Sequence, residues 1–166
     1  MGCVTGDYLN NCAKKTIGGI ATIFIADSST VDGVTGGNGT PVTDVTMTAL
    51  EVFYKFEFQR DEAVFTETIG ENGVVTQTLT IPARGRSQEL RNFIQALVDC
   101  RCGITVIHKE NTGIEWIWGF DDGEEAFANE GEGTSGAAKA DPNQESITLT
   151  ASATRKADTF TGIIPV

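Results

Sequence analysis

Apolar and polar residues alternate along much of the chain, which is the period of a β-strand that buries one face. The clearest example is LEVFYKFEFQ, whose charged and polar residues share one face while the other face is apolar and carries Val52, Tyr54, Phe56 and Phe58. In IGGIATIFIA both faces are apolar, as in a strand that is covered on two sides. The pattern therefore predicts strands over 17–26, 42–59, 63–69, 74–82, 104–108, 114–120 and 146–155.

One segment has helical spacing instead. In SQELRNFIQALVDCRCG the apolar residues recur every three or four positions, Ser87 is placed to cap the free amides of the first turn, and Gly103 follows the end. We expect a helix over about 87–102. It should pack on a sheet by its apolar stripe, which comprises Leu90, Phe93, Ile94, Leu97 and Val98.

Turn residues join the strands. Asn72-Gly73 suits the positive φ angles of a tight hairpin, and Asn111-Thr112-Gly113 marks a second turn after the helix. The run VDGVTGGNGTPVTD, 31–44, predicts a long loop. Strands, one central helix and more strands, linked by hairpins or loops, predict a mainly β fold: an antiparallel β-sandwich or barrel of two packed sheets with one flanking α-helix.

The 166 residues fit a single domain. Residues 1–16 are polar and aperiodic, so we expect an N-terminal arm that is ordered only where something holds it. The β-sandwich domain should span 17–157, and 158–166 should be a C-terminal tail. The acidic, glycine-rich segment before Ser146 is expected to be a flexible connector.

Charge excludes some classes of partner. The formal net charge is −11, which is the wrong sign for a protein that grips nucleic-acid phosphates. No apolar run approaches the roughly 20 residues of a membrane-spanning helix. The N-terminus also lacks the basic flank and apolar run of a secretory signal peptide. We therefore expect no membrane partner, no binding of DNA, and synthesis in a cytoplasm.

The sequence offers little for catalysis. Its single histidine, His108, lies in an expected strand beside Lys109 and Glu110, and no nucleophile or metal-protease motif accompanies it. The acidic run 121–133 lacks the spacing of a calcium-binding loop and is expected to be solvated. We expect no enzyme activity, no cofactor and no metal.

The four cysteines leave three alternatives open. They form a C-x8-C pair and a C-x-C pair, and neither spacing is that of a common zinc knuckle. A disulfide between the pairs would need an oxidising compartment. We favour reduced structural thiols at Cys3, Cys12, Cys100 and Cys102.

The order of elements resembles the major tail tube protein of long-tailed bacteriophages, a family that shares its fold with the inner tube of contractile tails and of type VI secretion. The resemblance spans roughly 17–157. It is carried by GGIATIFIA, the strand pair around FYKFEFQ, FTETIGENGVVTQTLTIP, SQELRNFIQALVDC, ITVIHKENTGIEWIWGF and SGAAKADPNQESITLTASATRKA. In such proteins a segment of the form sGxxxxDxxg leads into the final strand, and the corresponding residues are Ser135, Gly136, Asp141, Pro142 and Asn143.

The resemblance implies a structural virion protein with a tail-tube-like β-sandwich domain. Six copies would form a ring, one sheet from each copy would join a continuous barrel around a lumen, and rings would stack into a conduit for genome delivery. The partners would be further copies of the chain and other phage tail proteins, with DNA passing through without being bound. The protein would be located in the phage tail after assembly in the cytoplasm of the host bacterium.

Two sets of residues are candidates for these contacts. Hydroxyl side chains that alternate with apolar residues are expected to face a lumen or a neighbouring subunit: Thr76, Thr78, Thr80, Thr148 and Thr150. Loop and acidic residues are expected at contacts between subunits or rings: Asp32, Gly33, Gly37, Asn38, Gly39, Asp61, Glu62, Glu130, Glu132 and Asp141.

Two other functions fit the same composition. A phage head–tail connector or a capsid-decorating protein would also be acidic and rich in strands. A carbohydrate-binding module would use Trp116 and Trp118 as an aromatic platform and the acidic loop as a calcium site. The same aromatic stripe could instead stack nucleic-acid bases, but without a basic rim we expect the tryptophans to lie in the core.

Overall fold

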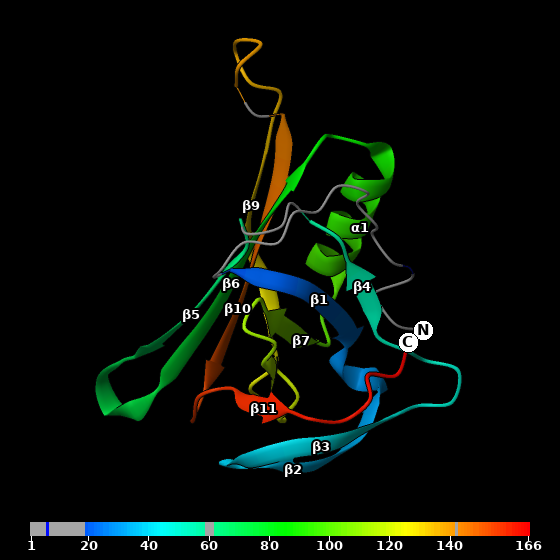
Figure 1. Cartoon of the computed structure of the whole chain (residues 1–166), viewed down its shortest axis with the longest axis vertical. Helices are drawn as coiled ribbons and strands as arrows, with labels where there is room; N and C mark the ends of the chain where they lie inside the picture. The colour runs from blue at the N-terminus through cyan, green and yellow to red at the C-terminus, as the bar shows by residue number, and fades with distance from the viewer. Residues whose placement is uncertain (1–5, 7–18, 59–61, 142) are drawn as a thin grey trace.

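The computed structural model describes residue 6 and residues 19–58, 62–141 and 143–166. These residues form two β-sheets and one α-helix (Figure 1), which confirms the predicted fold class. The strands are β1 Ile20–Asp27, β2 Val31–Gly37, β3 Thr40–Met47, β4 Tyr54–Phe56, β5 Val64–Ile69, β6 Val75–Arg84, β7 Ile104–Glu110, β8 Glu115–Trp118, β9 Phe127–Thr134, β10 Gln144–Ala153 and β11 Asp158–Phe160, and the helix is α1 Gln88–Asp99.

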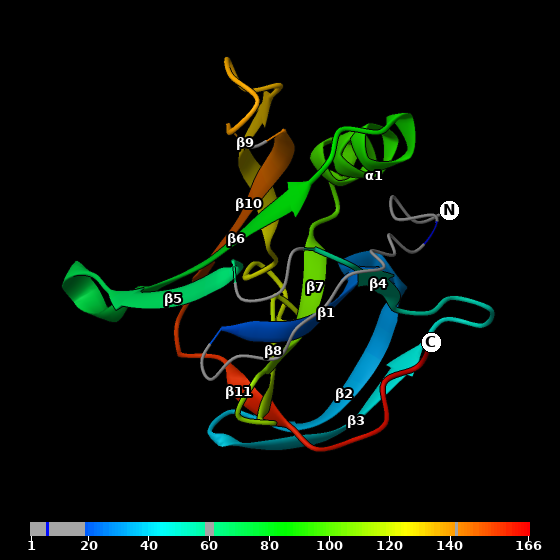
Figure 2. The ribbon, with the colours of Figure 1, turned by 45° about the horizontal axis from the view of Figure 1, so that its top comes forward.

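The two sheets have different sizes and orders. Seven strands follow the order β2-β3-β11-β8-β7-β1-β4, and four follow the order β5-β6-β10-β9. Every pairing is antiparallel except that of β11 with β3, which is parallel. Helix α1 contacts β9 and β10, so it covers one end of the four-stranded sheet (Figure 2).

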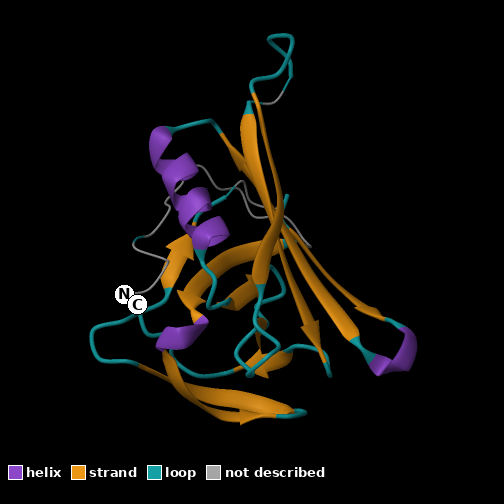
Figure 3. Ribbon diagram, turned by 180° about the vertical axis from the view of Figure 1, so that it is seen from behind, coloured by secondary structure: helices purple, strands orange, loops and turns teal. Residues whose placement is uncertain are grey.

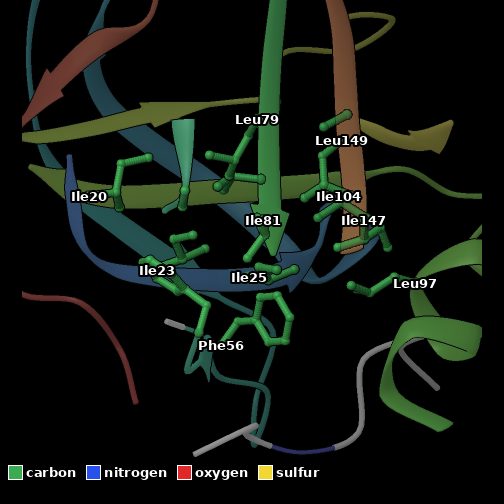
Figure 4. Packing of buried hydrophobic residues seen from close by; sticks show 14 of the residues in the cluster. Ile20, Ile23, Ile25, Phe56, Leu79, Ile81, Leu97, Ile104, Ile147 and Leu149 are labelled. Carbon is green, nitrogen blue, oxygen red and sulfur yellow. The ribbon is translucent and has the colours of Figure 1, made fainter. Parts of the chain in front are cut away.

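The main core lies between the two sheets and α1. Figure 4 shows side chains from β1, β6, β10 and α1 pointing toward one another, and Ile23, Leu79, Leu97 and Leu149 are fully buried there. Each such side chain contributes about 1.5–3 kcal/mol when it leaves water. A second cluster lies apart from the main core and comprises Ala26, Val42, Val45, Phe53, Ile107, Ile117 and Phe160.

Local signals in the sequence are confirmed at the helix and the turns. The Ser87 hydroxyl accepts a hydrogen bond from the Leu90 amide at 3.1 Å, as an N-cap should. Asn72 and Gly73 both have positive φ angles, of 64° and 77°. Helix α1 ends at Asp99, three residues before the predicted end.

The predicted long loop over 31–44 is wrong, because these residues form the hairpin of β2 and β3. Its valines have no strict alternation in the sequence, but Val42 and Val45 are buried in the second cluster. Gly36 permits the narrow bend: its φ is +98°, and a Cβ there would lie 2.3 Å from the carbonyl oxygen of Pro41.

The predicted tail over 158–166 is also wrong in part. Residues Asp158–Phe160 form β11, which pairs with β8 and β3. Phe160 is 3% exposed and belongs to the second cluster, so burial of its ring holds this short strand in place. The expected arm over 1–16 lies outside the described residues except for Gly6.

The expected connector before Ser146 is shorter than predicted. Residues up to Thr134 belong to β9, which pairs with β10 along most of its length. Only residues 135–143 link the two strands. Asp141 fastens this link, since its carboxylate accepts hydrogen bonds from the amides of Ala137 and Ala138 at 2.8 and 2.7 Å.

Candidate assembly surface

The outer face of the four-stranded sheet is built from hydroxyl side chains. In β6 and β10 every second residue is buried, so the residues between them lie on the other face. The strands pair with Thr80 opposite Thr148 and Thr78 opposite Thr150, and the Oγ1 atoms of Thr80 and Thr148 are 3.3 Å apart. The structure thus brings the five predicted threonines together on one face.

Strand β5 extends this hydroxyl face. Thr66 pairs with Thr78, and Thr68 with Thr76, so both of these threonines lie on the same face as the predicted ones. Both are exposed. They lie outside the predicted set, although Phe65-Thr66-Glu67-Thr68 has the same alternation that identified the others.

Both edges of this sheet are open within the described part of the chain. There, β5 pairs with β6 alone and β9 pairs with β10 alone. The two edge strands are also staggered, because β5 covers 75–80 of β6 while β9 covers 144–150 of β10, whose partners in β6 are 78–84. An edge strand presents backbone N–H and C=O groups that a further strand can pair with.

A groove runs between α1 and the open edge of β9. Its volume is about 310 Å³, and the helix contributes Ile94 and Val98 to its wall. Val98 is 53% exposed although the apolar stripe predicted that it packs on the sheet. The floor is formed by β9 itself and includes Ala128 and Gly131. An added strand at this edge would therefore cover apolar side chains of α1.

The predicted contact residues of the first hairpin lie in the other sheet. Asp32 and Gly33 are in β2, and Gly37, Asn38 and Gly39 are at the tip of the hairpin. The backbone amides of Asn38 and Gly39 donate to the Asp158 carboxylate at 3.0 and 3.1 Å. The tip is thus fastened within its own chain, and its predicted contact with a neighbour stays a prediction.

The other predicted contact residues are spread along the four-stranded sheet. Glu62 accepts a hydrogen bond from Arg84 at 2.6 Å. Glu130 and Glu132 lie in β9 opposite Thr148 and Ser146, which places them beside the hydroxyl face. Asp61 lies outside the described residues.

Arg155 holds three segments together at the end of β10. Its guanidinium contacts the Asp121 carboxylate at 2.5 Å, the Asp158 carboxylate at 3.5 Å and the Asn38 side-chain oxygen at 3.1 Å. Partial burial raises the pKa of Asp121, and the charge of Arg155 opposes that rise. The residue thus links the first hairpin to the last strand.

Replacement of Arg155 by alanine is expected to destabilise the fold by about 1–3 kcal/mol, because it leaves the buried Asp158 without its cation. Urea unfolding monitored by circular dichroism measures this loss. Lys156→Ala is the matched control, since Lys156 is exposed and carries the same charge. Equal stability of the two variants would contradict the role given to Arg155.

His108 and Trp118 lie in the core, whereas Trp116 lines a surface pocket with Thr40 and Lys156. His108 is 0% exposed, and Trp118, 1% exposed, donates from Nε1 to His108 Nδ1 at 3.2 Å. Trp118 confirms the predicted core position, whereas Trp116 is half-buried. Among the residues that the structure describes, no three acidic, cysteine or histidine side chains are grouped to hold a metal ion.

The cysteines correct one expectation. Cys100 is disulfide-bonded, so the prediction of reduced thiols is wrong at this position. Cys102 is a free thiol on the surface. Cys3 and Cys12 lie outside the described residues.

No protein-family model matches the sequence, and no curated protein matches it significantly. Within the described ranges, no helix has both the length and the apolar character needed to cross a membrane.

Proposed function

We propose that the chain is a structural subunit that joins copies of itself edge to edge into six-membered rings, and that these rings stack into the tube of a phage tail. The observation that carries the proposal is the four-stranded sheet, which among the described residues has an open strand at each edge and a face of hydroxyl side chains that no other element covers. Isolated open edges promote uncontrolled aggregation, and closure by sister copies removes them.

The strand directions suit such a closure. Successive strands of the sheet are antiparallel, so β5 and β9 run in opposite directions. Copies related by rotation about an axis that runs along the strands keep the same strand directions. Strand β9 of one copy therefore meets β5 of the next copy in the antiparallel sense found inside the sheet. The stagger between β5 and β9 also agrees with a barrel, whose strands must tilt and shift in register.

The groove beside β9 supports the same seam. A strand added at this edge lies under Ile94 and Val98 and removes their apolar surface from water. At the other edge, Val64 is 54% exposed and Ile69 is 67% exposed. Head-to-tail contact between two unlike edges is the arrangement that generates rings when the rotation closes.

The hydroxyl face suits a wall along which DNA slides. In the proposed ring it faces the lumen, and its central rows contain threonine and serine side chains without charge: Thr66, Thr68, Thr76, Thr78, Thr80, Thr148, Thr150 and Ser152. Hydroxyls bind water as donors and acceptors. They offer phosphates no cation, so DNA passes without the counterion release that drives binding.

The rest of the proposal follows from the resemblance and the acidic composition. The subunit has no enzyme activity and no cofactor, it is assembled in the cytoplasm of the host bacterium, and it ends in the virion beside other tail proteins. Contacts between rings use the ends of the sheet, where the 135–143 link lies at one end and the β5–β6 hairpin projects from the other (Figure 3).

Electron microscopy of the purified chain over a rising concentration series tests this function. We expect six-fold rings that stack into hollow tubes, because the open edges find partners by mass action. Trimers or a persistent monomer at high concentration would contradict the proposal and favour a connector or decoration protein. Binding of glycans with calcium-dependent melting would instead favour a carbohydrate-binding module.

A further inference from the structure

We propose that acid causes strand β5 to open locally, away from the core, through protonation of His108, which lies beneath this strand. The consequence for assembly rests on the proposed function, because β5 is one of the two edges assigned to the seam. The opening of β5 itself is a property of the single chain.

The geometry places His108 directly under β5. The Phe65 ring, from β5, lies over the imidazole with 4.4 Å between ring centroids, and it also contacts Trp118 at 5.3 Å. Trp118 Nε1–H donates to His108 Nδ1, so the proton of the neutral imidazole is on Nε2. His108 Nε2 has no hydrogen-bond partner among the described residues.

The surroundings of the His108 ring do not accommodate a second proton on the imidazole. Protonation at Nδ1 would set its N–H against the Trp118 N–H and would bury a charge without a counter-ion. Burial accordingly lowers the pKa of His108 from 6.5 to about 3. An imidazolium therefore requires water at the ring.

Within the described ranges, no charged side chain contributes to the pKa shift of His108, so none is placed to compensate for a protonated ring. Lys109 and Glu115 pair with each other at 3.0 Å, and the Glu67 carboxylate accepts from the Ala157 amide at 2.6 Å. The ionisable side chains on the strands around His108 are Asp27 on β1, Glu67 on β5, Arg84 on β6, Lys109 and Glu110 on β7, and Glu115 on β8.

Displacement of β5 is the least costly way to admit water. Among its six residues only Phe65 and Glu67 are partly buried, and the other four are exposed. Within the described part of the chain the strand pairs with β6 alone, whereas β7 is held between β1 and β8. Local opening occurs where few buried contacts are lost.

The sign of the effect follows from proton binding. The open form takes up a proton near the ordinary pKa of 6.5, and the closed form does so only near 3. Between these values the open form binds more protons, so each fall in pH favours it. At about pH 4.5 the population of the open form should rise by about 50- to 100-fold relative to pH 7.

Hydrogen exchange with mass spectrometry tests the proposal on the isolated chain. After correction for the intrinsic rate, protection of the β5 amides should fall by about 50- to 100-fold between pH 7 and about pH 4.5, while the centre of β10 changes much less. His108→Asn is the control, since its side-chain oxygen replaces Nδ1 as the acceptor and does not titrate. In this variant the protection of the β5 amides should be the same at pH 7 and at about pH 4.5.

Three results would overturn the proposal: protection of β5 that does not change with pH, the same loss in the His108→Asn variant, or an equal loss across all strands. If that variant does not fold, nuclear magnetic resonance of the native chain decides, because an imidazole that titrates near 6.5 with β5 in place contradicts the mechanism. If the chain forms tubes but the protection of its β5 amides does not depend on pH, this inference alone is refuted. Acid-opened β5 in a chain that never assembles would refute the proposed function alone.

Discussion

Val98→Glu is expected to leave the chain folded and to block its assembly. Val98 is 53% exposed, so the substitution should change the free energy of unfolding by about 0.5 kcal/mol or less. In the proposed ring a neighbour's strand covers this position, and Glu130 and Glu132 also line the groove. A carboxylate buried there costs several kcal/mol, so the concentration needed for assembly should rise by at least about 100-fold.

Light scattering across a concentration series measures this effect, and electron microscopy identifies the product. The matched control is Asn92→Glu, which adds the same charge to the same helix at an exposed residue outside the groove. The control also retains an acceptor for Gln88 Nε2, which bonds to Asn92 at 2.7 Å. Assembly of both variants at the same concentration would show that the groove lies outside the seam.

Replacement of Leu149 by alanine is expected to destabilise the isolated chain by about 2–5 kcal/mol. Leu149 is 0% exposed in the main core, where it pairs across the sheet with Leu79. Its removal leaves a cavity between the two sheets that their rigid strands cannot close. The midpoint of denaturant unfolding reports the loss.

Thr148→Ala is the control for this prediction, since the neighbouring residue points to the hydroxyl face. It loses one contact, to Thr80 at 3.3 Å, and should cost no more than about 1 kcal/mol. A larger loss of unfolding free energy in Thr148→Ala than in Leu149→Ala would contradict the assignment of the two faces of the sheet. The same variant should remain able to assemble.

Local patterns predicted much of the fold because they depend on residues close in sequence. The alternation in β6 and β10 correctly separated the buried residues from the threonines, and Ser87 correctly marked the start of α1. The adjacency of Thr80 and Thr148 needed more than a pattern, because 68 residues separate them in the chain.

The wrong predictions come from segments that long-range packing holds in place. Glycine-rich composition predicted a loop over 31–44, and Phe160 stands in a strand of three residues that is too short to show a period. Both become ordered by burial in the second cluster. The helix pattern likewise included Val98 in the core, since the pattern cannot show where the sheet beneath a helix stops.

The bond from Asp158 to the tip of the β2–β3 hairpin has a consequence for biosynthesis. It joins residues 119 and 120 positions apart, and β11 must lie beside β3 before the second cluster is complete. On the ribosome β11 emerges after all the other strands, so a nascent chain waits with its first hairpin undocked. A polypeptide cut short before that strand would keep apolar surface exposed and become a substrate for proteolysis, which would keep truncated copies out of the assembly proposed above.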